Sequence, residues 1–198
     1  MRHFLTLLLL LGILGVLGGC GGKSPVPLEN LPEDYGLEQA KKDGVVVHEN
    51  GDITSGQEVW EAFVQTASAG KPASVRLGFY YTLDDPSRYA PEYYESVKDD
   101  YPLLFILDLT FDGASYTLTG IENGERWTKP YACLVRYEND APERASYDRS
   151  ISYALLNDKD IAEDETMTYE RLFGSLFSAR LEDHIDFHLV YMDYICDN

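Results

Sequence analysis

The chain has 198 residues, of which 34 are acidic and 16 are lysine or arginine, so that its formal net charge at pH 7 is −18. A balance this acidic excludes nucleic acid as an expected partner, because binding to phosphates requires a basic surface. Hydrophobic residues make up 44% of the chain and aromatic residues 13%, which excludes a disordered protein and suffices for one domain with a real core. The acidic side chains keep such a domain soluble, and cation binding is the alternative use for them.

The first residues follow the layout of a bacterial lipoprotein signal. A basic start at Met1–His3 precedes an apolar run over Phe4–Val16, and Leu17-Gly18-Gly19-Cys20 ends in small residues and a cysteine. We therefore expect residues 1–19 to be a signal peptide and Cys20 to carry a lipid that anchors the chain to the extracytoplasmic face of a bacterial membrane. A transmembrane anchor is the alternative, but the run is short for a spanning helix, which needs about 20 residues.

Residues 20–34 are expected to be the lipidated cysteine and a flexible tether, because glycine, proline and acids give this stretch no periodicity. A single globular domain is then expected over residues 35–198. It begins with a short helix at 36–42 and a strand at 45–47. Asn50-Gly51 supplies the positive backbone angles of a tight turn.

An amphipathic helix is predicted over residues 56–69. Ser55 and Glu58 have the spacing of a capping box, in which the two side chains satisfy each other's backbone amides. Gly70 and Pro72 end the helix. Its apolar residues recur with the helical period, so we expect one face to be buried. These residues are Val59, Trp60, Phe63, Val64 and Ala67.

The hydrophobic period changes to two after this helix, which indicates strands. Val75, Leu77 and Phe79 alternate along a predicted strand at 73–82. Residues 103–111 are an almost continuous apolar run, typical of a central strand. Between these two strands, residues 83–102 carry turn signals and a helical turn from Pro91.

The second half of the domain is predicted to continue as an antiparallel meander. Asp112-Gly113 and Asn123-Gly124 are hairpin turns. A helix over 168–180, with Leu172, Phe173, Leu176 and Phe177 on one face, follows an acidic loop at 157–167. The further expected strands are 115–121, one that includes 131–137, 150–156 and 184–195.

This order of elements predicts an α+β fold. The expected architecture is one antiparallel sheet of five to six strands. The helices 56–69 and 168–180 are expected to pack on a face of that sheet. No internal repeat is found.

Several turns also carry a family resemblance. Asn50-Gly51-Asp52-Ile53 precedes the amphipathic helix, Tyr81-Thr82-Leu83-Asp84-Asp85-Pro86 ends the next strand, and Leu109-Thr110-Phe111-Asp112-Gly113 closes the central one. Over residues 45–137 this succession resembles an uncharacterised domain of small lipoproteins from Gram-positive bacteria. The resemblance implies a location at the surface of a Gram-positive cell and no particular activity.

His184, Asp186 and His188 are the best candidates for a metal site. On a strand these alternate residues share one face, and imidazole with carboxylate suits a transition metal such as zinc. The two histidines would be about 13 Å apart on a straight strand, so one ion would take Asp186, one histidine and outside ligands. The alternative is the polar face of an outer strand.

A calcium loop is a second hypothesis, because carboxylates gather between residues 157 and 165. Its candidate ligands are Asp158, Asp160, Glu163 and Asp164. Calcium prefers six to eight oxygen ligands, but the spacing is not that of an EF-hand. A solvated acidic loop is the alternative.

Two cysteines remain besides Cys20. Cys133 and Cys196 could pair in a disulfide, since export favours oxidation, or each could be a small buried hydrophobe. Neither a Cys/His cluster for zinc, nor a Gly-x-Ser-x-Gly elbow, nor a phosphate-binding glycine loop occurs in the sequence. Nucleophilic catalysis therefore has little support.

The chain has 15 tyrosines, which either cover half-buried strands or bind a ligand through their faces. Tyr89, Tyr93 and Tyr94 are the candidate binding aromatics, because they are dense in a predicted loop. We expect a non-enzymatic binding or envelope-associated module. Its partners would be the membrane, through the lipid on Cys20, and an extracellular protein, peptide or glycan. A metal-assisted hydrolase using His184, Asp186 or His188 is the alternative; otherwise no cofactor is expected, and calcium or zinc would be the ion if one is bound.

Overall fold

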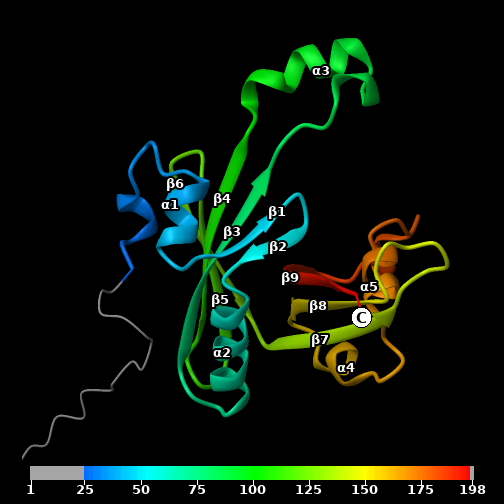
Figure 1. The fold of residues 1–198 in the computed structure, drawn as a ribbon. Helices are drawn as coiled ribbons and strands as arrows, with labels where there is room; N and C mark the ends of the chain where they lie inside the picture. Colours follow the sequence, from blue (N-terminus) through cyan, green and yellow to red (C-terminus); the bar gives the residue numbers. More distant parts are fainter. Residues whose placement is uncertain (1–24, 197–198) are drawn as a thin grey trace, which may run out of the picture.

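The computed structural model describes residues 25–196, which form an α+β fold with one six-stranded and one three-stranded sheet (Figure 1). The predicted fold class is therefore confirmed, but the single antiparallel sheet is wrong. The strands are β1 (Val46–Glu49), β2 (Asp52–Ser55), β3 (Ala73–Tyr81), β4 (Leu103–Phe111), β5 (Tyr116–Glu122), β6 (Glu125–Tyr131), β7 (Cys133–Asp140), β8 (Arg149–Leu156) and β9 (Phe187–Ile195).

The six-stranded sheet has the order β2-β1-β3-β4-β5-β6 and is mixed, because β1 and β3 run parallel. The turn predicted at Asn50-Gly51 is confirmed, with φ of 51° and 102°, and it joins β1 to β2, a strand that was not predicted. Strand β2 returns the chain to the end at which β1 starts, and helix α2 (Gln57–Ser68) then connects to β3, which runs in the same direction as β1. Parallel neighbours require such a crossover, which a pattern of alternating residues does not reveal.

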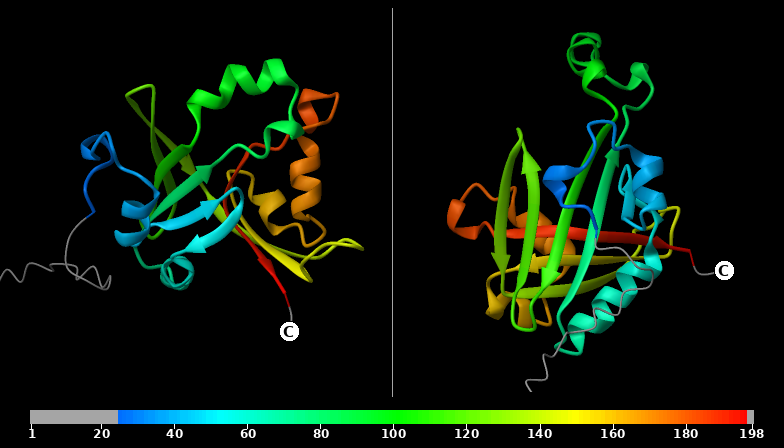
Figure 2. Two further views of the ribbon diagram at one scale, coloured as in Figure 1. Left: turned by 45° about the horizontal axis from the view of Figure 1, so that its top comes forward. Right: turned by 90° about the vertical axis from the view of Figure 1, so that its left-hand side faces the viewer.

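The three-stranded sheet has the order β7-β8-β9 and is antiparallel. Its strands run across those of the larger sheet (Figure 2). The strand predicted to include residues 131–137 is in fact the end of β6 and the start of β7, and the chain changes sheets at Ala132. Asn157 fixes this change: its Oδ1 accepts from the amide of Ala132 at 3.1 Å, and its Nδ2 donates to the carbonyl of Pro130 at 3.4 Å.

The helices differ from the prediction in their caps and their placement. Gly56, with φ 78°, precedes α2 and Ser55 ends β2, so the capping box is wrong although the helix itself is confirmed. The helix predicted over 168–180 is a seven-residue α5, and among its predicted apolar face Leu172 alone is buried. The described α-helices are α1 (Leu37–Lys42), α2, α3 (Pro91–Val97), α4 (Lys159–Glu163) and α5 (Tyr169–Ser175).

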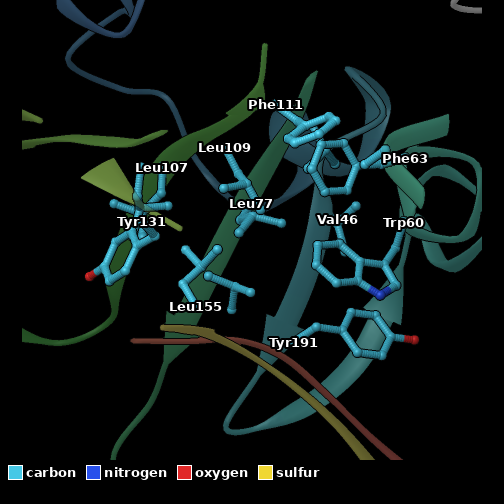
Figure 3. Packing of buried hydrophobic residues seen from close by; sticks show 14 residues of the cluster. Val46, Trp60, Phe63, Leu77, Leu107, Leu109, Phe111, Tyr131, Leu155 and Tyr191 are labelled. Atoms are coloured by element: carbon cyan, nitrogen blue, oxygen red, sulfur yellow. The ribbon is translucent and has the colours of Figure 1, made fainter. Parts of the chain in front are cut away.

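The main core lies between the two sheets, where side chains from both sheets and from α2 meet (Figure 3). Trp60 of α2 stacks on Tyr191 of β9 with ring centroids 4.8 Å apart, and Leu77 of β3 and Leu155 of β8 are fully buried. Burial of each leucine-sized side chain contributes about 1.5–3 kcal/mol. Helix α2 thus fills the space between the sheets.

Helices α1, α4 and α5 cover the outer faces of the two sheets. Helix α1 packs on the outer face of the larger sheet, against Val45 and Val47. Helices α4 and α5 cover the outer face of the smaller sheet through Ile161 and Leu172. The prediction of two helices on one face is wrong, because each sheet has one face in the common core and needs its own cover outside.

Part of the predicted tether belongs to the fold. A 3₁₀ turn, η1 (Leu28–Asn30), packs beside β4 and β5 and buries Leu28. Glu29 forms an ion pair with Arg126 of β6, with 3.1 Å between the charged atoms. The folded part therefore begins before residue 35, whereas the predicted signal peptide and Cys20 lie outside the described residues.

His48 joins the two sheets from within the core. It lies on β1, stacks on Phe79 at 5.2 Å and meets Tyr191 edge-on at 5.3 Å. Its Nε2 accepts from the amide of Met192 in β9 at 3.4 Å, while Nδ1 has no hydrogen-bond partner within residues 25–196. Burial lowers the pKa of His48 to about 4, so the ring is neutral in the folded protein at pH 7.

Acid should therefore weaken the fold through His48. Between pH 6.5 and 4 the unfolded chain binds a proton that the folded ring refuses, so the free energy of unfolding falls by about 3 kcal/mol as pH decreases. Denaturant titrations of the wild type and of His48→Phe across this range measure the effect. We expect the variant to lack this part of the pH dependence, and equal slopes for both proteins would contradict the assignment.

Candidate functional site

The connection between β3 and β4 forms a projecting arm, residues 82–102, at the top of Figure 1. The arm contains α3 between two 3₁₀ turns, η2 (Pro86–Arg88) and η3 (Lys98–Asp100). None of residues 82–102 is buried. The arm is therefore ordered without contributing a residue to the core.

Local signals in the sequence explain why the arm is ordered. The Oδ1 atom of Asp85 accepts from the hydroxyl and the amide of Ser87, at 2.6 and 2.9 Å, and these bonds lower the pKa of Asp85. Pro86 opens η2 and Pro91 opens α3, each at a position that suits its fixed φ. The helical turn predicted from Pro91 is thus confirmed.

Asn50 holds the base of the arm against the larger sheet. Its Nδ2 donates to the hydroxyl of Thr82 at 2.8 Å, and its Oδ1 accepts from the amide of Thr82 at 2.9 Å. Its own amide donates to the carbonyl of Tyr80 at 2.8 Å. The β1–β2 turn therefore fixes the direction in which the arm leaves the sheet.

The three candidate tyrosines do come together on the arm. The ring of Tyr89 lies 5.9 Å from that of Tyr93 and 6.1 Å from that of Tyr94. The Tyr89 hydroxyl accepts from the amide of Asp84 at 3.1 Å, which positions the central ring. Tyr93 is 53% exposed, so this tyrosine cluster presents aromatic surface to solvent.

A second aromatic pair lies where β3 and β4 leave the sheet. Tyr81 and Phe105 are 40% and 49% exposed, with ring centroids 6.1 Å apart. They lie on the face of β3 and β4 that points into the main core, which we call the inner row. On this face Phe105 pairs with Phe79, and the next pair along the strands, Leu77 and Leu107, is buried. The smaller sheet does not extend over this end of the row.

The proposed metal ligands do not share a strand face. His184 and Asp186 precede β9, which begins at Phe187, so the geometry expected for this site is wrong. His184 Nε2 donates to the carbonyl of Ser178 at 3.0 Å, and Asp186 pairs with Lys129 at 2.9 Å. Burial, with nearby Lys129, lowers the pKa of His188. Within residues 25–196 no group of histidine, cysteine or acidic side chains has the arrangement of a metal site.

The acidic loop is organised by its own backbone. Asp158 caps α4 by accepting from the amides of Asp160 and Ile161, at 2.9 and 3.2 Å. Asp164 accepts from the amide and hydroxyl of Thr166, at 2.8 and 2.7 Å. Asp158 and Asp164 therefore cap a helix and a turn, which are common roles of aspartate.

The disulfide between Cys133 and Cys196 is contradicted, because both thiols are free. Cys133 pairs with Leu156 at one end of β8, whereas Cys196 follows Ile195, which pairs with Arg149 at the other end. Seven strand residues separate those ends by about 23 Å, while a disulfide needs α-carbons within about 7 Å. The strand register, which the sequence does not show, decides this outcome.

The second half of the chain has its own exposed apolar residues. Phe177 and Leu181, after α5, are 73% and 82% exposed, and Phe173 lies edge-on to Phe177 at 5.3 Å.

Within the described residues no helix is long and apolar enough to cross a membrane.

Comparisons with known proteins add no assignment to this geometry. No protein-family model, no curated protein and no solved structure matches the chain.

The arm should be dispensable for folding. Replacing residues 82–102 by Asn-Gly would join the paired residues Tyr81 and Leu103 through a two-residue hairpin turn. Because no arm residue is buried, we expect Tm to change by less than about 4 °C, as measured by circular dichroism. Trp60→Ala is the destabilising control and should cost about 3–5 kcal/mol. Loss of cooperative unfolding in the arm variant would show that the arm supports the core.

Proposed function

We propose that this protein is a membrane-anchored extracytoplasmic lipoprotein that works as a binding module, and that the arm is its recognition element. The observation that carries the proposal is the arm itself: residues 82–102 are ordered, fixed at the base by Asn50 and free of any buried residue. The partner is an extracellular macromolecule that contacts the tyrosine cluster.

The cost of ordering supports this role. Fixing the backbone of each residue costs about 1–2 kcal/mol, and a segment without buried side chains recovers little of it from the core. Hairpin connections in compact domains usually have about 2–5 residues, whereas the antiparallel neighbours β3 and β4 are joined by residues 82–102. A rigid scaffold that presents such a loop is the common arrangement of binding surfaces.

The competing hydrolase hypothesis has less support. It needed Asp186 and one of the two histidines, His184 or His188, on a shared strand face. In the structure His184 and Asp186 precede β9 and contact different neighbours. The tyrosine cluster is instead brought together by α3 and η2 in the way that a binding surface requires.

The lipid anchor rests on the sequence around Cys20 and is compatible with the fold. The first described segment of the chain, drawn in blue, lies apart from α3 in the views of Figures 1 and 2. A lipid on Cys20 would therefore hold the domain by one side and leave the arm free. The resemblance to small lipoproteins of Gram-positive bacteria agrees with this anchoring and stays a prediction.

Anchoring is tested by Cys20→Ala in the bacterium that produces the protein. We expect the wild type to partition into the detergent phase on phase separation and the variant to lose this behaviour, because two acyl chains are needed for stable attachment. Cys133→Ala is the matched control and should stay in the detergent phase. A membrane-bound Cys20→Ala protein would indicate a transmembrane anchor instead.

Recognition through the arm is tested by photo-crosslinking on intact cells. A benzoylphenylalanine at Tyr93 should give discrete adducts, whereas the same residue at Tyr194 of β9, which is 39% exposed, should not. Adducts from Tyr194 alone, or none from either position, would remove the arm as the recognition element.

A further inference from the structure

The charge of the arm identifies the chemistry of its partner. Residues 82–102 contain six acidic and two basic side chains. Arg88 pairs with Asp84 at 2.8 Å, and Lys98 pairs with Glu95 at 2.7 Å, so both cations are already neutralised. The remaining acids are Asp85, which caps η2, and Glu92, Asp99 and Asp100.

Glu92, Asp99 and Asp100 are exposed and form no ion pair within residues 25–196. Glu92 is in the first turn of α3, and the other two are in η3 at its end. A rise of 1.5 Å per residue separates the two positions by about 10 Å. A single small cation therefore cannot neutralise both ends, whereas a chain with several cations can.

Two residues of the tyrosine cluster lie on the same short helix as Glu92. Tyr93 and Tyr94 occupy α3 directly after Glu92, and Tyr89 stands against both rings. The face of a tyrosine ring attracts ammonium and guanidinium groups, and its flat surface also packs on the aliphatic stem of lysine or arginine. The carboxylates and the aromatic faces of the arm thus favour the same kind of side chain.

We infer that the arm binds a lysine- or arginine-rich segment of a partner protein. This inference rests on the proposed function and names the partner class of the same surface. An anionic partner is disfavoured by the net charge of −18. A neutral glycan would use the tyrosine rings but would leave Glu92, Asp99 and Asp100 without a role.

The binding should be weak for each contact and sensitive to salt. Exposed ion pairs contribute little individually, and salt screens them over about 8 Å at physiological ionic strength. The aromatic contacts are less affected by salt. The two contributions can therefore be separated by the salt dependence of binding.

The test uses the full-length protein in a nonionic detergent and fluorescence anisotropy. The probes are labelled peptides of alternating lysine and serine or arginine and serine, with glutamine and serine as the neutral control and an N-acetylglucosamine oligomer as the glycan. We expect binding of the two cationic peptides, with an affinity that falls about tenfold from 0.03 to 0.3 M salt. Preference for the neutral peptide or the glycan would overturn the inference.

Variants localise the binding. The triple variant Glu92→Gln, Asp99→Asn and Asp100→Asn should bind the cationic peptides at least about fivefold more weakly than the wild type. The salt dependence of its affinity should also be smaller. The double variant Tyr93→Ala and Tyr94→Ala should bind the cationic peptides more weakly but keep the salt dependence of the wild type. Both should unfold at the wild-type temperature, because no arm residue is buried.

The matched control is Glu122→Gln with Glu125→Gln and Glu165→Gln, which removes the same charge from exposed positions outside the arm. We expect it to bind within about twofold of the wild type. If the control variant lost as much affinity as the arm variant, the overall charge of the protein would explain the binding, and the inference would be overturned. Adducts from Tyr93 on cells without peptide binding would overturn the cationic class and leave the proposed function standing.

Discussion

The fold depends on apolar contact between two sheets that share no ladder of hydrogen bonds. The chain passes from one sheet to the other once, at Ala132, so side-chain packing holds the sheets together over the rest of their area. Trp60 is central to this contact, because α2 inserts it between the sheets against Tyr153 and Tyr191. His48 adds a polar contact that can form only while the sheets are closed.

The unequal width of the sheets explains where function can reside. Three strands and one helix cannot cover six strands, so one end of the inner row of β3 and β4 is not covered by the smaller sheet. Tyr81 and Phe105 mark the point where this row becomes exposed. The arm leaves the larger sheet at that point, and its aromatic residues extend the same chemistry away from the core.

Much of the local structure can be predicted from the sequence, because it depends on neighbouring residues. The strand predicted over 103–111 has those bounds in the structure, since its run of apolar residues is long and ends at Asp112-Gly113. Residues 131–135 form one continuous apolar run, which predicts one strand, so nothing local marks the change of sheet at Ala132. Phe173 and Phe177 follow the period of a buried helical face, yet both are exposed in the described part of the chain. Cover, register and sheet membership are set by residues distant in the chain.

In the candidate site, too, the features that depend on neighbouring residues were predicted and those that depend on distant residues were not. The density of tyrosines predicted that Tyr89, Tyr93 and Tyr94 act together, and short-range contacts do gather them. The bond between Asn50 and Thr82 joins residues 32 positions apart and had no local signal, although Asn50 was predicted correctly as a turn residue. That one residue serves both purposes: its backbone, at positive φ, closes the β1–β2 turn, and its side-chain amide orients the arm.

The arm that we propose as the recognition element lies outside the core, which separates two demands on the sequence. Substitutions between Tyr89 and Asp100 change the charge and shape of the arm without opening a cavity, because none of these residues is buried. Substitutions at Trp60 or Tyr191 would alter packing between the sheets whatever their effect on binding. The structure thus lets the specificity of the arm vary while the stability of the scaffold is kept, provided that Asn50 continues to hold the base.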